Sequence, residues 1–252
     1  MLPIRPALRL SLVVAVPLGA SRPVTPAPIV PTVAGLRTEY QVDPLGIDAL
    51  RPRVSWQLAS TARNTIQSAY EIQVATDSAG LTHGAHLLWD SRRVRSGASV
   101  FVSYNGPPLQ SAMRYYWRVR VWTAAGAASS WSTPAYWETG LLHANDWSAK
   151  WIGAPPSPAD SGETPSPLLR REFTLAGRIS SARLYVTSLG LNRVFLNGER
   201  VGTAELAPGW TSYSHRLQYQ TYDVTAMLLA GANAVGAMLG DGWYRGYLGF
   251  DH

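Results

Sequence analysis

The residues best suited to binding or catalysis gather near the C-terminal end of the sequence, in LAPGWTSYSHRLQYQTYDVT (206–225) and GDGWYRGYLG (240–249). Aromatic rings lie flat against sugar faces, while hydroxyls, amides and carboxylates hydrogen-bond to sugar hydroxyls. Loops expose such side chains more often than strands do. The sequence therefore predicts carbohydrate contacts at Trp210, Tyr213, Asp241, Trp243 and Tyr244. The alternative is that these residues fill the core and corners of a β-sandwich.

Motifs of enzymatic catalysis are absent from the sequence. Ser212 and Ser214 stand beside His215 without a placed carboxylate, and no GxSxG elbow occurs, so a serine hydrolase is not supported. The five histidines form no HExxH or similar cluster, which argues against a catalytic zinc. Asp223 is explained as a helix cap, and Asp241 can be read as a turn residue that satisfies its own backbone. We therefore predict no catalytic residue and no metal ligand.

Composition narrows the class of protein. The chain has 252 residues, 46% of them hydrophobic, with 10 Trp and 12 Tyr, which is enough to build substantial cores. The formal charge of +6 is spread along the chain, almost entirely as Arg, and forms no basic run, so we expect no nucleic-acid partner. The absence of cysteine excludes thiol nucleophiles and disulfides.

The N-terminus has the three-part pattern of a secretory signal. Arg5 and Arg9 precede an apolar run that closes on Gly19-Ala20-Ser21, so residues 1–20 are predicted to be a signal peptide. That run is too short for a membrane span. The prolines in residues 21–35 predict an extended linker. We expect a secreted or periplasmic protein if the signal is used and a cytoplasmic one otherwise, the alternative being an apolar tail or a misassigned start.

Residues 36–142 have the pattern of short β-strands separated by turns. In RYYWRVRVW (114–122), alternate residues including Tyr115 point to one face, while Arg118 and Arg120 point to the other and shield the sheet. Leu109 lies six residues before Tyr115. This resembles the fibronectin type III signature, in which such a tyrosine hydrogen-bonds to upstream backbone. A sandwich of that type is therefore predicted.

A second β region follows a Pro- and Ser-rich boundary near residues 143–167. Asn197-Gly198 predicts a two-residue hairpin. Residues 216–222 have a strand pattern, and 223–233 a short helical turn capped by Asp223 and ended by Gly231. The fold class is all-β, with two successive sandwiches. The second is expected to be incomplete, since a strand-like segment so close to the end would leave an edge uncovered.

Several long motifs occur in one order along the chain: LRTEYQVDPLGIDALRPRVSWQL (36–58), RYYWRVRVW (114–122), WETGLL (137–142), LNGERVG (196–202), LAPGWTSY (206–213) and LGDGWYRGYLG (239–249). Together they resemble the N-terminal part of bacterial α-L-rhamnosidases. The resemblance implies a fibronectin type III-like sandwich over 36–142 and a jelly-roll accessory domain over 143–252 that helps to recognise substrate. In the family, these precede an (α/α)₆ barrel with two catalytic glutamates that hydrolyses terminal α-L-rhamnose with inversion.

No segment of the chain matches that barrel, so no catalytic residue is assigned by resemblance. The implied partner is a rhamnose-containing glycoside or polysaccharide. Calcium is possible, because some relatives bind rhamnose through calcium in an accessory β-domain, but its ligands match no positions here. Two alternatives stay open: a stand-alone carbohydrate-binding module and a structural interaction protein. The sequence does not indicate the oligomeric state.

Overall fold

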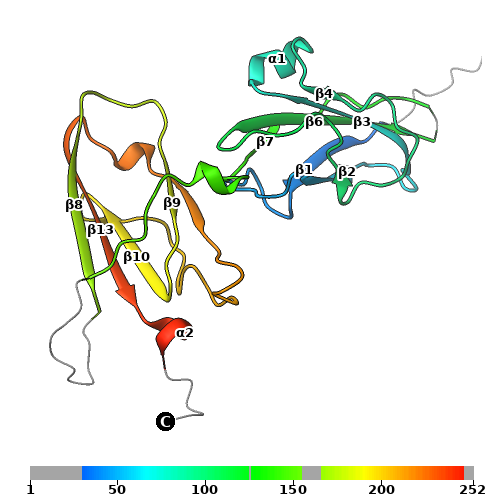
Figure 1. Ribbon diagram of the computed structural model, residues 1–252. Helices are drawn as coiled ribbons and strands as arrows, with labels where there is room; N and C mark the ends of the chain where they lie inside the picture. The colour runs from blue at the N-terminus through cyan, green and yellow to red at the C-terminus, as the bar shows by residue number, and fades with distance from the viewer. Residues whose placement is uncertain (1–29, 125, 155–165, 247–252) are drawn as a thin grey trace, which may run out of the picture.

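The computed structural model describes residues 30–124, 126–154 and 166–246, which form two successive domains made almost entirely of β-strands (Figure 1). The predicted signal peptide and residues 21–29 of the predicted linker lie outside these ranges. The first strand begins at Thr32, ahead of the expected boundary at residue 36. No helix in the described part is long and apolar enough to cross a bilayer.

The first domain packs two antiparallel sheets face to face, as β-sandwiches do. The three-stranded sheet contains, in spatial order, β1 (Thr32–Thr38), β2 (Arg53–Ala59) and β5 (Val102–Ser103). The four-stranded sheet contains β4 (Trp89–Asp90), β3 (Gln67–Ala75), β6 (Arg114–Thr123) and β7 (Ala135–Glu138). A short helix, α1 (Ser78–His83), joins β3 to β4. This three-on-four sandwich confirms the predicted fold class.

The core of the first domain follows from the alternation in β6. Tyr115, Trp117, Val119 and Val121 are buried, and the residues between them are half-buried on the outer face. The Tyr115 hydroxyl accepts a hydrogen bond from the Gln110 backbone N–H at 2.8 Å, which confirms the predicted tyrosine corner.

The second domain has a four-stranded and a two-stranded sheet, both antiparallel. The larger contains β11 (Glu199–Arg200), β10 (Leu191–Leu196), β13 (Gly231–Gly240) and β8 (Leu168–Leu175) in spatial order. The smaller contains β12 (Gln220–Asp223) and β9 (Arg183–Val186). The helical segments are η1 (Ala144–Asp146), η2 (Thr225–Met227) and α2 (Gly242–Arg245). A small core around Val194, Leu196, Val201 and Val224 holds the sheets together.

The local predictions for this domain were met in part. Asn197 and Gly198 have φ values of 52° and 87° between β10 and β11, which confirms the hairpin. The strand expected over 216–222 is formed only from Gln220 onward. Asp223 accepts the Thr225 backbone N–H at 3.0 Å, but Val224 occupies the N-cap of η2, so the predicted cap was wrong by one residue.

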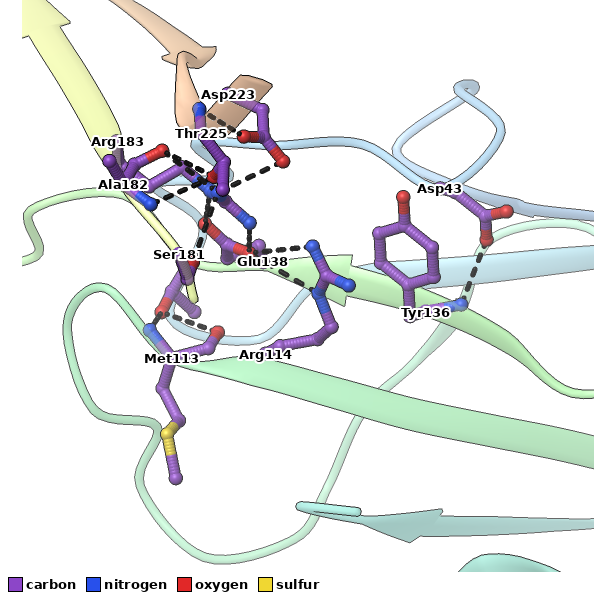
Figure 2. A network of polar contacts seen from close by, with 11 residues as sticks. Asp43, Met113, Arg114, Tyr136, Glu138, Ser181, Ala182, Arg183, Asp223 and Thr225 are labelled. Carbon is purple, nitrogen blue, oxygen red and sulfur yellow. Dashed lines mark hydrogen bonds and ion pairs between the residues drawn. The ribbon is translucent and has the colours of Figure 1, made fainter. Parts of the chain in front are cut away.

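The two domains meet where the outer face of the β9–β12 sheet lies against the end of β7 (Figure 2). Arg183 of β9 donates to Glu138 of β7, with 2.8 Å between Nη2 and Oε2, and also forms an ion pair with Asp223 at 3.0 Å. Arg114 donates to the same Glu138 carboxylate at 3.1 Å. The Tyr219 hydroxyl accepts the Leu141 backbone N–H at 2.9 Å.

Candidate carbohydrate-binding site

The structure brings the five predicted contact residues together at the end of the second domain, where α2 lies in Figure 1. Trp210 and Tyr213 come from the loop between β11 and β12, and Trp243 and Tyr244 from α2 directly after β13. The Asn192 backbone N–H donates to the Ala207 carbonyl at 2.8 Å, which ties the first of these loops to β10. The two stretches identified in the sequence therefore form one surface.

A glycine is required where β13 turns into α2. Gly242 has a φ of +50°, and a Cβ at this position would lie 2.6 Å from Cγ of Leu191. Only a residue without a side chain fits that conformation and that contact. The glycine sets the point at which the chain turns and presents Trp243 and Tyr244.

The aromatic side chains form two ring pairs. Trp210 and Trp243 are parallel, with an interplanar angle of 2° and ring centroids 6.0 Å apart. Tyr213 meets Tyr244 edge to face at 5.4 Å. Trp210 is 63% exposed and Tyr244 44% exposed. The exposed Trp210 indole, with the half-buried Trp243 indole parallel to it, gives a flat apolar surface on which the C–H face of a sugar ring can lie.

Polar groups border this aromatic surface. Asp241 forms an ion pair with Arg245 at 2.6 Å and makes no side-chain hydrogen bond to the start of α2. Its carboxylate therefore does not cap the backbone N–H groups at the start of α2. The hydroxyls of Thr211 and Tyr213 are buried and have no hydrogen-bond partner among the described residues. Such groups are rare and are commonly completed by a water or a ligand.

His215 lies near this surface without the partners of a catalytic base. The hydroxyls of Ser212 and Ser214 both contact its Nδ1, at 3.1 and 2.9 Å. Within the described part of the chain, no carboxylate contacts its ring. The described residues also contain no group of three His, Asp or Glu that could hold a metal ion.

Two family models match the chain. Residues 33–143 match the Rha78A-like N-terminal immunoglobulin domain, and residues 177–252 match the α-L-rhamnosidase N-terminal domain. The chain belongs to the α-L-rhamnosidase family and corresponds to its N-terminal region. The first match agrees with the sandwich of the first domain, since the immunoglobulin domain is itself a β-sandwich.

Known α-L-rhamnosidases share this region. The enzyme of Alteromonas sp. (strain LOR) is 41% identical over 81% of this chain and 23% of its own length, and that of Streptomyces avermitilis is 31% identical over 84% and 36%. The crystal structure of the Streptomyces avermitilis enzyme complexed with L-rhamnose has a TM-score of 0.81 and 30% identity, covering 87% of this chain and 37% of that one. The Dictyoglumus thermophilum α-L-rhamnosidase has a TM-score of 0.80 and 33% identity, covering 88% and 26%. The chain thus spans about a quarter to a third of these relatives.

A concavity in this α-L-rhamnosidase region was not predicted from the sequence. It has a volume of about 710 Å³ and is lined by Trp147, Trp151, Tyr185 and Tyr219 among others. Trp147 and Tyr219 meet edge to face at 5.2 Å. Burial raises the pKa of the Tyr185 and Tyr219 phenols, so both stay neutral. The sequence signal is the pair of tryptophans in DWSAKW (146–151), a stretch whose composition indicates a domain boundary.

Sequence analysis also missed Arg245, the ion-pair partner of Asp241. The two residues are four apart, a spacing that makes side chains neighbours on a helix. The GDGWYRG segment was expected to be a turn, so the pairing was not foreseen. The one-turn helix α2 is the feature that creates it.

Proposed function

We propose that this chain is the carbohydrate-recognising accessory part of an α-L-rhamnosidase and binds terminal α-L-rhamnose of a glycoside or polysaccharide. The parallel pair formed by Trp210, which is 63% exposed, and the half-buried Trp243 is the observation that supports this most directly. The family match and the similarity to a rhamnosidase crystallised with L-rhamnose support the choice of sugar.

The chemistry of L-rhamnose suits the proposed surface. Its methyl group and ring C–H bonds provide apolar contact for the two indoles. Its hydroxyls can donate to the Asp241 carboxylate and accept from the Arg245 guanidinium, which stand together at 2.6 Å. Tyr213 and Tyr244 border the same surface and complete the proposed contacts.

In this proposal, hydrolysis of terminal α-L-rhamnose, with inversion, is performed outside these two domains. The described residues contain no pair of carboxylates that we assign as acid and base. The purified chain should therefore release no aglycone from an aryl α-L-rhamnoside above the rate of a blank. Turnover above that rate, lost when an exposed carboxylate is replaced, would contradict this assignment.

Titration calorimetry with methyl α-L-rhamnoside tests the binding site. Trp210→Ala should weaken binding about tenfold, since it removes a stacking contact of ~1.4 kcal/mol. Trp151→Ala is the matched control, because Trp151 is 64% exposed but lines the 710 Å³ concavity, which none of the five contact residues lines. If only the control lost binding, the rhamnose site would be that concavity and not the aromatic surface. No heat with the unaltered chain, with or without calcium, would favour the structural interaction protein.

We further propose export directed by residues 1–20. A fusion of residues 1–35 to a phosphatase that is active only outside the cytoplasm should give active enzyme. Leu12→Arg, which interrupts the apolar run, should abolish that activity because signal recognition depends on the run. Equal activity of both fusions would refute export through this segment.

A further inference from the structure

The outer face of the four-stranded sheet in the first domain has a continuous stack of arginines and tryptophans. Arg118 and Arg120 lie over the Trp131 ring, with 4.4 and 4.6 Å from guanidinium carbon to ring centroid. Arg120 and Arg93 lie over the Trp122 ring at 5.0 and 4.8 Å. All four distances are within the range of cation–π attraction. The order along the stack is Arg93, Trp122, Arg120, Trp131 and Arg118.

Two features of the chain build this stack. The two-residue period of β6 puts Arg118, Arg120 and Trp122 on the same face of the sheet. The hydroxyls of Ser129 and Ser132 accept the backbone N–H groups of β6 at 3.0 and 3.1 Å. Those bonds fasten the segment that contains Trp131 beside β6. The guanidinium groups are therefore held in place before any partner arrives.

The stack has an excess of positive charge. Glu71 pairs with Arg120 at 2.7 Å, while Arg118 donates to the neutral amide of Gln73 at 2.8 Å. Arg93 of the stack and Arg95, two residues further along the chain, are exposed and form no ion pair with any described residue. Burial, with the neighbouring charge of Arg120, lowers the pKa of Arg118. The arginines of this face therefore outnumber the carboxylates that pair with them.

We propose that this arginine–tryptophan face binds a polysaccharide that bears carboxylate groups, that is, a uronate-containing glycan. Planar guanidinium groups bind carboxylates through two parallel hydrogen bonds. Because stacking already holds them, less side-chain entropy is lost when they bind. This site is in the first domain, and the proposed rhamnose contacts are in the second.

The arrangement of the rings favours a glycan over a nucleic acid. Single-stranded nucleic acids bind by stacking bases on free aromatic faces. Trp122 and Trp131 each already face two guanidinium groups, so the stack offers cationic donors in place of free rings. Charge complementarity with repeated carboxylates is the interaction that this face provides.

Binding to immobilised polygalacturonate at low ionic strength tests the proposal. Arg93→Gln/Arg95→Gln should weaken binding about fivefold or more, because it removes two unneutralised donors. The control Arg37→Gln/Arg51→Gln removes the same charge from exposed positions of the three-stranded sheet and the loop before β2, and should change binding less than about twofold. Added salt should weaken binding of the unaltered chain. Trp210→Ala should leave it unchanged, which separates this proposal from the rhamnose site.

Three outcomes would overturn the proposal. They are no binding to polygalacturonate, with or without binding to dextran sulfate, equal losses in the two double variants, and single-stranded DNA binding as tight as that of polygalacturonate. Neutral dextran is the blank. The thermal unfolding midpoint of Arg93→Gln/Arg95→Gln should fall by no more than about 4 °C, because both side chains are exposed and Arg93 loses only one cation–π contact of about 0.5–1 kcal/mol.

Discussion

Arg183 of the second domain binds both carboxylate oxygens of Glu138 in the first, through Nε and Nη2 (Figure 2). The two side chains are only 12% and 6% exposed. Glu138 also accepts from Arg114, so one buried carboxylate contacts two guanidinium groups from different domains. Charge-assisted, bidentate hydrogen bonds of this kind fix geometry as well as contribute energy. The two domains are therefore held in one relative orientation.

Arg183→Met should destabilise the chain strongly, because it leaves Glu138 buried with a single cation. Removing one partner of a buried ion pair costs about 3–5 kcal/mol, and the remaining bond from Arg114 puts the expected loss near the lower limit. Urea unfolding followed by tryptophan fluorescence measures the free energy of unfolding.

The control for that substitution is Arg170→Met. Arg170 pairs with Glu172 at 2.7 Å, but both side chains are at least 65% exposed. Exposed pairs contribute about 0–1 kcal/mol. If Arg183→Met cost no more than Arg170→Met, the junction would not contribute to stability.

Gly46→Ala should disturb the packing between the domains. Gly46 has a φ of +75°, and a Cβ added there would clash with Oγ1 of Thr221 in β12. Gly126 is the matched control, since it has a φ of +85° and a Cβ added there would have no atom of the described residues within 4 Å beyond its chain neighbours. Both substitutions incur a backbone cost of about 1–2 kcal/mol, but only Gly46→Ala adds the clash. We expect a larger loss of unfolding free energy for Gly46→Ala. Equal losses would show that Thr221 moves aside without a measurable free-energy cost.

The ion pair between Asp223 and Arg183, next to the junction, should weaken in acid. Burial raises the pKa of the Asp223 carboxyl, but hydrogen bonds from Thr225 and the charge of Arg183 outweigh burial and lower the pKa below 3.8. The folded-state pKa lies below the unfolded value, so Asp223 stabilises the fold above pH 3.8 and loses that effect as the pH falls through the lowered pKa. The difference in unfolding midpoint between the unaltered chain and Asp223→Asn should therefore shrink below pH 3.8. A difference that grew in acid would contradict this assignment.

Strand periodicity made the first domain predictable from sequence. The alternation in residues 114–122 specified which side chains of β6 are buried, and Leu109 with Tyr115 specified the corner. Asn197-Gly198 specified the hairpin in the second domain for a similar local reason. These features depend on neighbours in the chain, which a sequence shows directly.

The junction and the pairing of Asp241 with Arg245 could not be predicted in the same way. Glu138 and Arg183 are 45 residues apart, and no local pattern indicates that they meet. The five aromatic-surface residues were grouped from composition, while their parallel and edge-on ring geometry depends on how the β11–β12 loop lies against α2. Such contacts depend on packing between segments far apart in the chain, and no local pattern in a single sequence indicates it.

Tyr115→Phe should destabilise the first domain by about 0.5–1.5 kcal/mol. The substitution removes the acceptor of the Gln110 N–H, and because Gln110 is exposed and the bond only partly buried, the loss is that of one ordinary hydrogen bond. Stacking of the ring on Trp137 is kept, so the hydroxyl alone is tested. Tyr70→Phe is the control, since Tyr70 is buried in the same core and its hydroxyl has no hydrogen bond to any described residue. Thermal unfolding of both variants should show a clear loss for Tyr115→Phe and a change within about 0.5 kcal/mol for Tyr70→Phe. Similar losses in the two would mean that the corner bond does not stabilise this sandwich.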